Sequence, residues 1–151
     1  MNFAVDWSRY RLVDLSLPVY PNQKVVGRPF EVKRSNLPDG THKFDIVNTH
    51  THVGSHIESP WHFYGEGKTC TDYPLDYFMG PAALLKGRLN PGEERVTLAE
   101  CRAQLEPLRG TFDRLVVRND SGLTPLRFEF ACVSYFAELG LKVFLFDATI
   151  E

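Results

Sequence analysis

Histidines are concentrated in one short segment of this sequence. Four of the five histidines lie within residues 50–62. Three of them and one glutamate follow the spacing H-x3-H-x-E-x3-H, which places His52, His56, Glu58 and His62 together. Imidazole and carboxylate are the ligand types that bind Zn²⁺, Mn²⁺ or Fe²⁺ in proteins. The segment therefore predicts a divalent-metal site, and the alternative is a histidine-rich surface loop.

A divalent ion at this position would make hydrolytic chemistry available at neutral pH. Such an ion lowers the pKa of its water from about 16 to roughly 7 and polarises a carbonyl oxygen. A carboxylate such as Glu58 can also bridge two ions. A histidine that is not a ligand can transfer protons, because its pKa lies near the working pH.

The residues between the candidate ligands indicate a strand end that leads into a loop. The i, i+4 spacing of His52 and His56 would suit a helix, but Gly54 and Pro60 disfavour one. In an extended segment, His56 and Glu58 point to the same side. We expect Gly54 to turn the backbone so that His52 reaches the same ion.

Three polar residues near this segment are expected to have no ligand role. His50 alternates with His52 and is expected to support the ligands at most. His42 lies beside a turn and is expected to be exposed, and Asp45 is expected to be an ordinary residue on the face of a strand.

Hydrophobic periodicity and turn residues predict the elements that must position the site. Strands are expected at 11–19, 30–33, 44–48, 80–86, 113–118 and 141–146, and helices at 97–105 and 127–139. Thr97 and Glu100 form the pattern of a capping box, and Gly140 is suited to close the second helix. The alternation of strand and helix in the second half predicts a parallel βαβ unit and an α/β fold.

Composition and charge exclude several functional classes. The 151 residues suit one domain over 1–151, with 43% hydrophobic and 24% charged residues. A net charge of −2 without a Lys/Arg cluster argues against nucleic acid as a partner. No apolar run is long enough to span a bilayer, and the N-terminus does not read as a signal peptide, so a cytoplasmic protein is expected.

Three widely spaced cysteines make a disulfide framework or a zinc ribbon improbable. Cys70, Cys101 and Cys132 form no CxxC pair. In a reducing compartment they are expected to be free thiols. Cys101 and Cys132 fall within the helical patterns and are expected in or near the core.

The segment from His52 to His62 resembles the motif of the cyclase family, whose best-known members are bacterial kynurenine formamidases and which includes isatin hydrolases. The family pattern is H-x-G-[TS]-H-x-D-x-P-x-H, and this sequence has H-V-G-S-H-I-E-S-P-W-H. Flanking segments are similar too, namely the D-L-S and Y-P of residues 14–21, G-P-A of 80–82 and the late strand of 140–147. The resemblance covers nearly the whole chain.

The resemblance implies a swivelling β/β/α domain with a mixed sheet and flanking helices, usually in homo-oligomers. It implies that His52, His56 and Glu58 bind the metal, Zn²⁺ first and Mn²⁺ as the second choice, and that His62 is the catalytic acid/base. Tyr20 would occupy a position that contacts substrate, whereas without the resemblance it is interpreted as turn or core packing.

The predicted function is metal-dependent hydrolysis of an amide, formamide or lactam C–N bond in a small substrate, aromatic or non-aromatic. The predicted assembly is a homo-oligomer such as a dimer or tetramer.

Two departures from the family matter. Glu58 replaces the usual aspartate, and the resemblance places a further ligand histidine and glutamate beyond Glu151. The alternative is therefore a truncated or degenerate relative that binds metal or a partner without catalysis.

Overall fold

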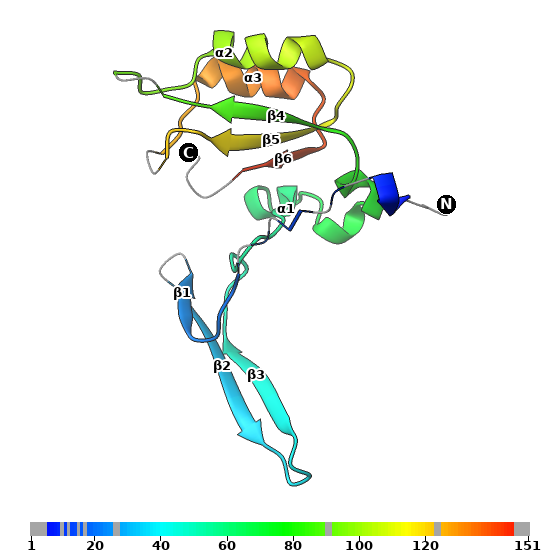
Figure 1. The fold of residues 1–151 in the computed structure, drawn as a ribbon, viewed down its shortest axis with the longest axis vertical. Coiled ribbons are helices and arrows are strands. Elements are labelled where there is room, and N and C mark those ends of the chain that lie inside the picture. The colour runs from blue at the N-terminus through cyan, green and yellow to red at the C-terminus, as the bar shows by residue number, and fades with distance from the viewer. Residues whose placement is uncertain are drawn as a thin grey trace. The chain divides into compact units, whose positions relative to one another are not determined.

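The computed structural model describes residues 6–9, 11, 13–14, 16, 18–25, 28–89, 92–122 and 125–146. It divides into two compact units, Met1–Cys70 and Thr71–Glu151, called here the N-terminal and C-terminal units. Two three-stranded sheets and a few helices make the chain mixed α/β (Figure 1), which confirms the predicted class. The predicted single domain stays a prediction, and the two units are described separately.

The N-terminal unit contains an antiparallel sheet in the order β1-β2-β3. Its strands are β1 at Gln23–Val25, β2 at Arg28–Asn36 and β3 at His42–Asn48. The register pairs Arg34 with Phe44, and it shifts between Glu31 and Val32. The strands predicted at 30–33 and 44–48 are confirmed, and both are longer than predicted.

The tight turn between β2 and β3 is confirmed at Pro38-Asp39-Gly40. Gly40 has a φ of +83°, which glycine adopts without a steric cost. The Asp39 carboxylate accepts hydrogen bonds from the backbone N–H of Thr41 at 2.9 Å and from its hydroxyl at 2.6 Å. These two bonds lower the pKa of Asp39 below its usual value and fix the reversal of the chain.

The strand predicted at residues 11–19 is wrong for the part of that range that the structure describes. Residues 11, 13–14, 16 and 18–19 lie outside every helix and strand, and residues 12, 15 and 17 lie outside the described residues. The Asp14 carboxylate accepts a hydrogen bond from the Ser16 N–H at 2.9 Å. An aspartate side chain that bonds the backbone two residues on competes with strand pairing, and this local turn replaces the strand.

Among the described residues of the N-terminal unit, none is buried. The exposed side chains include Phe44 and Ile46, at 65% and 61% exposure, which alternate along β3 and so share one face of the sheet. Two or three antiparallel strands are marginal in water without a covered apolar face. The apolar side chains of Phe44 and Ile46 are thus exposed within the N-terminal unit.

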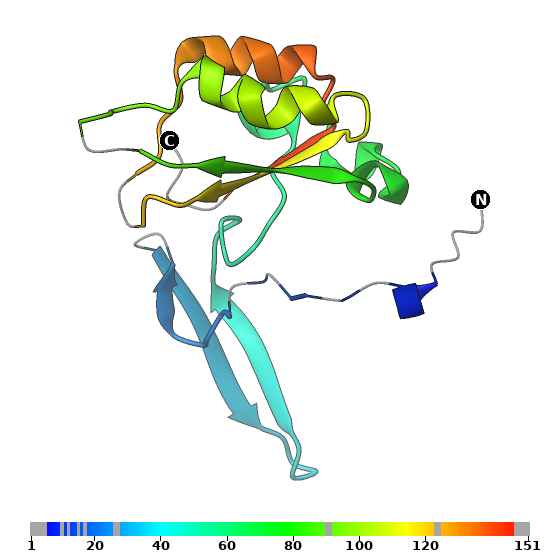
Figure 2. The ribbon, with the colours of Figure 1, turned by 45° about the horizontal axis from the view of Figure 1, so that its top comes forward.

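The C-terminal unit is built on a parallel sheet in the order β4-β5-β6. Its strands are β4 at Ala82–Gly87, β5 at Arg114–Asn119 and β6 at Val143–Leu145. Two helices, α2 at Leu98–Leu105 and α3 at Phe130–Glu138, lie together over one face of this sheet (Figures 1 and 2). The predicted parallel βαβ arrangement is confirmed.

Both predicted helices of the C-terminal unit are present. Thr97 caps α2, and its side chain and that of Glu100 form the complete reciprocal capping box that the sequence predicts. The second helix begins at Phe130, later than the predicted start at 127. Residues 127–129 are engaged elsewhere, because Phe128 forms a parallel bridge with Val96.

The core of the described residues lies in the C-terminal unit, between the sheet and the two helices. It consists of Ala83, Leu85, Val96, Cys101, Leu105, Phe112, Leu115, Val117, Leu126, Cys132, Tyr135 and Phe136. Cys101 and Cys132 are fully buried with their sulfurs 3.7 Å apart, and all three cysteines are free thiols, as predicted. Burial raises the pKa of both core thiols.

Helix α1 at Pro60–Phe63 and four short 3-10 helices, at Trp7–Arg9, Cys70–Asp72, Leu75–Phe78 and Glu106–Leu108, complete the described elements. The described helices are all too short, or too polar, to cross a lipid bilayer.

Candidate metal centre

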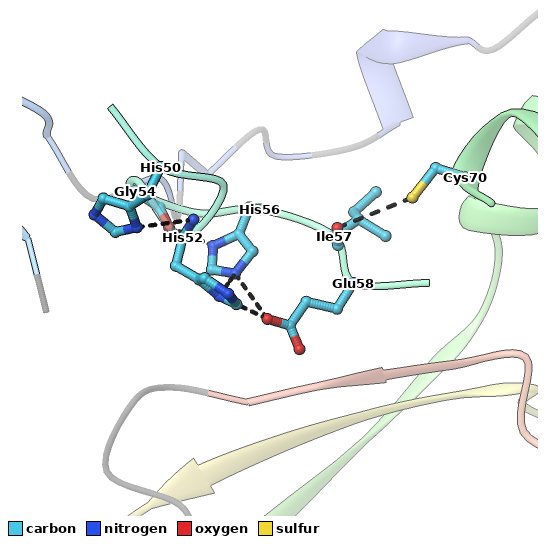
Figure 3. Close-up of polar contacts among 7 residues, drawn as sticks. All are labelled: His50, His52, Gly54, His56, Ile57, Glu58 and Cys70. Atoms are coloured by element: carbon cyan, nitrogen blue, oxygen red, sulfur yellow. Dashed lines mark hydrogen bonds and ion pairs between the residues drawn. The ribbon is translucent and has the colours of Figure 1, made fainter. Parts of the chain in front are cut away.

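The candidate ligands lie in the loop that follows β3, within the N-terminal unit. The strand ends at Asn48, and the chain then carries His52, His56 and Glu58 without regular structure. Figure 3 shows the Glu58 carboxylate pointing toward the rings of both histidines. The predicted placement at a strand end that leads into a loop is confirmed.

Three donor atoms converge in this loop: His52 Nδ1, His56 Nε2 and Glu58 Oε1, called here the donor cluster. His52 Nδ1 lies 2.7 Å from Glu58 Oε1 and 3.2 Å from His56 Nε2. His56 Nε2 lies 3.4 Å from Glu58 Oε1. The three side chains are about one third exposed, at 30%, 32% and 31%.

The donor cluster fits one small divalent ion. Ligand atoms at roughly 2.0–2.2 Å from an ion in tetrahedral geometry are separated from one another by about 3.3–3.6 Å. The observed separations of 2.7–3.4 Å approach that spacing, so small side-chain shifts bring all three atoms onto one ion. Two imidazoles and one carboxylate are a donor set that zinc commonly takes in hydrolases, with an open position remaining.

A backbone carbonyl fixes the orientation of the His56 ring. A carbonyl oxygen only accepts, so the 2.9 Å contact between His56 Nδ1 and the Gly54 carbonyl places the proton on Nδ1. His56 Nε2 then presents its lone pair to the cluster, the arrangement by which metal-ligating histidines are usually held. Gly54 has a φ of +64°, which permits this turn.

His50 is not one of the three residues of the donor cluster, but it contacts one of them. Its Nδ1 accepts a hydrogen bond from the backbone N–H of His52 at 3.2 Å (Figure 3). His50 therefore steadies the backbone of a candidate ligand, the supporting position expected from the sequence.

His62 comes from a short helix that the sequence did not predict. Helix α1 spans Pro60–Phe63, with Ser59 as its N-cap residue and proline in the first turn. The His62 ring centroid lies 5.2 Å from that of His52, with the rings edge to face at 77°. The structure thus brings His62 beside the donor cluster but leaves it outside the group of three that could hold an ion.

An open pocket of about 410 Å³ surrounds these side chains. Besides the donor cluster and His62, its lining comprises Thr51, Ile57, Ser59 and Trp61. Sequence reasoning missed these four residues as parts of the site. Of these four residues, only Trp61 could have been suspected from the sequence, because a large aromatic residue directly precedes the candidate acid/base His62.

Tyr20, predicted from the resemblance to contact substrate, is not among the residues that line this pocket. Its side chain is 62% exposed.

Asp45 pairs with Lys43 at 2.9 Å on the strand, and exposed His42 contacts Arg34. Neither belongs to the donor cluster, as expected.

The loop that follows α1 contacts the first turn of this helix through backbone hydrogen bonds and close packing. The Trp61 N–H donates to the Lys68 carbonyl at 3.0 Å, and the Gly67 N–H donates to the Tyr64 carbonyl at 2.8 Å. A Cβ on Gly67 would lie 2.6 Å from the Pro60 carbonyl carbon, so only glycine fits there. The Cys70 thiol also contacts the Ile57 carbonyl at 3.9 Å (Figure 3).

Comparison with known proteins adds family information to this geometry. A family model described as "Putative cyclase" matches residues 13–149, which include the whole pocket. The kynurenine formamidase of Salinibacter ruber is 29% identical over 119 residues, covering 76% of this chain and 54% of that protein. The kynurenine formamidase of Geobacillus thermodenitrificans is 29% identical over 85 residues, covering 56% of this chain and 39% of its own length. This chain therefore spans about half, or less, of the length of these relatives.

Proposed function

Because the chain belongs to the cyclase family, we propose that it is a metal-dependent hydrolase of a C–N bond in a small amide, formamide or lactam. The observation that carries this proposal is the convergence of His52, His56 and Glu58 beside His62 in one pocket. The names of the relatives, kynurenine formamidases, support a formamide bond as the first substrate class to test.

The donor cluster would hold the divalent ion, with Zn²⁺ preferred and Mn²⁺ the alternative. When bound, such an ion supplies water of lowered pKa and polarises a carbonyl oxygen. Glu58 contributes the negative charge of the cluster, which favours a cation. His52 and His56 would contribute imidazole nitrogens, and the Gly54 carbonyl orients the ring of His56.

His62 would move the proton in this scheme. Hydrolysis forms a C–O bond from water, breaks the C–N bond and must deliver a proton to the leaving nitrogen. An imidazole suits both halves of this transfer, because it can accept a proton from the attacking water and then donate it. The position of His62 next to the donor cluster, and outside it, supports this role.

The test is zinc-dependent turnover of formanilide, a simple N-aryl formamide, by the full 151-residue chain. We expect aniline release at neutral pH that stops on chelation and returns when Zn²⁺ is added. If the chain binds zinc but hydrolyses neither formanilide nor other N-formyl or N-acyl amides, the alternative is favoured, namely a relative that binds metal without catalysis.

For the whole fold, we propose the swivelling β/β/α arrangement of this family, in a cytoplasmic protein. Two sheets and the helices α2 and α3 are the components that such a domain requires.

We also propose that the protein is a homo-oligomer, with a dimer as the first expectation, in which a second copy covers the exposed face of β3. Replacing Phe44 and Ile46 by serine and threonine removes apolar contact area from that face and should shift the protein toward monomer. Sedimentation velocity at several concentrations measures this shift, with Val47→Thr on the opposite face as the matched control. A wild-type protein that is monomeric at every concentration would contradict the proposal.

A further inference from the structure

Two of the three cysteines meet inside the C-terminal unit and are called here the core thiol pair. Cys101 comes from α2 and Cys132 from α3, the two helices that lie together over the sheet (Figures 1 and 2). Their sulfurs are 3.7 Å apart. Because a disulfide joins sulfurs at about 2.05 Å, an approach of less than about 2 Å separates the two thiols from a covalent bond.

Burial keeps the core thiol pair unreactive while the C-terminal unit is folded. Both cysteines have 0% exposure, so a dissolved oxidant does not reach either sulfur. Burial also raises the pKa of both thiols, which leaves little of the thiolate that attacks oxidants. Oxidation of the pair therefore requires a local opening that carries α2 or α3 away from the core.

The third cysteine provides an internal comparison. Cys70 is exposed, and its thiol lies 3.9 Å from the Ile57 carbonyl. A dissolved oxidant reaches Cys70 without any opening of the core. The rate at which Cys70 reacts therefore reports direct attack, whereas the rate of the core thiol pair reports opening.

Hydrogen peroxide is an oxidant whose chemistry balances for this pair. In the opened unit, one thiolate attacks the peroxide, the O–O bond breaks, and a sulfenic acid and hydroxide form. When the helices close again, the second thiolate attacks the sulfenic sulfur, an S–S bond forms and a second hydroxide leaves. The protons of the two thiols convert both hydroxides to water. The two sulfurs together lose two electrons, and the peroxide gains them.

We propose that the core thiol pair is a redox-sensitive switch, in which peroxide joins Cys101 and Cys132 by a reversible disulfide whenever the C-terminal unit opens and recloses. The two cysteines are 31 positions apart, so the crosslink closes a long loop and restricts the unfolded chain. The oxidised unit therefore opens less often than the reduced one. The switch is independent of the proposed hydrolase, because neither cysteine belongs to the donor cluster or lines its pocket.

Peroxide treatment of the full chain, followed by alkylation of the remaining thiols and peptide mapping, tests the switch. We expect the Cys101–Cys132 disulfide to form much more slowly than Cys70 is oxidised. In about 1 M urea, below the unfolding transition, formation of this disulfide should accelerate by roughly fivefold or more, because urea raises the population of the open state. The rate at Cys70 should change by less than about 2-fold, because Cys70 needs no opening.

The crosslink should also be visible in thermal stability. Oxidation should raise the midpoint of the main unfolding transition by about 5–15 °C in calorimetry, and dithiothreitol should reverse the shift. Cys70→Ala is the matched control and should keep both the disulfide and the shift, whereas Cys132→Ala should show neither. If Cys132→Ala does not fold, the oxidised and reduced forms of Cys70→Ala supply the same comparison.

Four results would overturn the proposal. They are a core thiol pair that reacts as fast as Cys70 in the native chain, sulfinic acids at the pair in place of a disulfide, no crosslink with or without urea, and an unfolding midpoint that falls on oxidation.

Discussion

Replacing His52 and His56 together by alanine should abolish stoichiometric zinc binding by this chain. The double variant removes two of the three donor atoms that lie 2.7–3.4 Å from one another, and Glu58 alone remains. Loss of a group that only hydrogen-bonds a ligand costs roughly 10- to 100-fold in metal affinity, so loss of two ligands should cost more than about 100-fold.

Competition with a chromophoric chelator measures this change in affinity. His42→Ala is the matched control, because it removes an exposed histidine from β3 of the same unit but leaves the donor cluster intact. Equal zinc affinity in the double variant and in wild type would show that the convergence of these side chains has no bearing on metal.

The second large effect is expected at His62. We expect His62→Ala to lower the turnover of formanilide by about 10²- to 10⁴-fold, the usual contribution of a general acid/base. Zinc affinity should change little, because His62 lies outside the group of three that could hold an ion. The combination of lost turnover and retained metal distinguishes a proton-transfer role from a ligand role.

Release of aniline and zinc affinity are measured on the same protein samples. His50→Ala provides the comparison, since His50 supports the backbone of His52 but does not line the pocket. Because His50 bonds the backbone of His52 and not its ring, turnover should fall by less than the roughly 10-fold that marks the low end for groups bonded to a ligand side chain. If His62→Ala lost zinc as severely as the double variant does, His62 would be a ligand, and the assignment of roles would be wrong.

The parts of the fold that the sequence predicted well are those with strong local signals. The capping box of Thr97 and Glu100 forms as expected, because each side chain finds its partner within one helical turn. Strands β4 and β5 were predicted from short apolar runs, and the structure buries alternate residues of β4 and most of β5. In contrast, the strand expected at 11–19 does not form where the structure describes it. The Asp14 carboxylate bonds the Ser16 N–H there, and the sequence does not show whether this local turn or the partial hydrophobic alternation will prevail.

The candidate site shows the same division between local and non-local information. The donor types and their convergence were predictable from spacing, together with the turn at Gly54. The sequence did not predict helix α1, because Pro60 disfavours helix at the residue before it. That reasoning is correct for Ser59, which is extended with a ψ of 164°, but proline is also well suited to the first turn of a helix. The close approach of Gly67 to the backbone of Pro60 is a contact that no pattern near Trp61 reveals.

Zinc bound to the donor cluster would link metal supply to the lifetime of the N-terminal unit. The described residues of this unit have no buried side chain, so little hydrophobic free energy opposes its local opening. Wherever a folded segment alone binds an ion, the binding free energy adds to its stability, by about 2.7 kcal/mol at a free ion concentration 100-fold above Kd. Zinc starvation would then expose the loop of His52 to proteases well before it affects the core between the parallel sheet and its two helices.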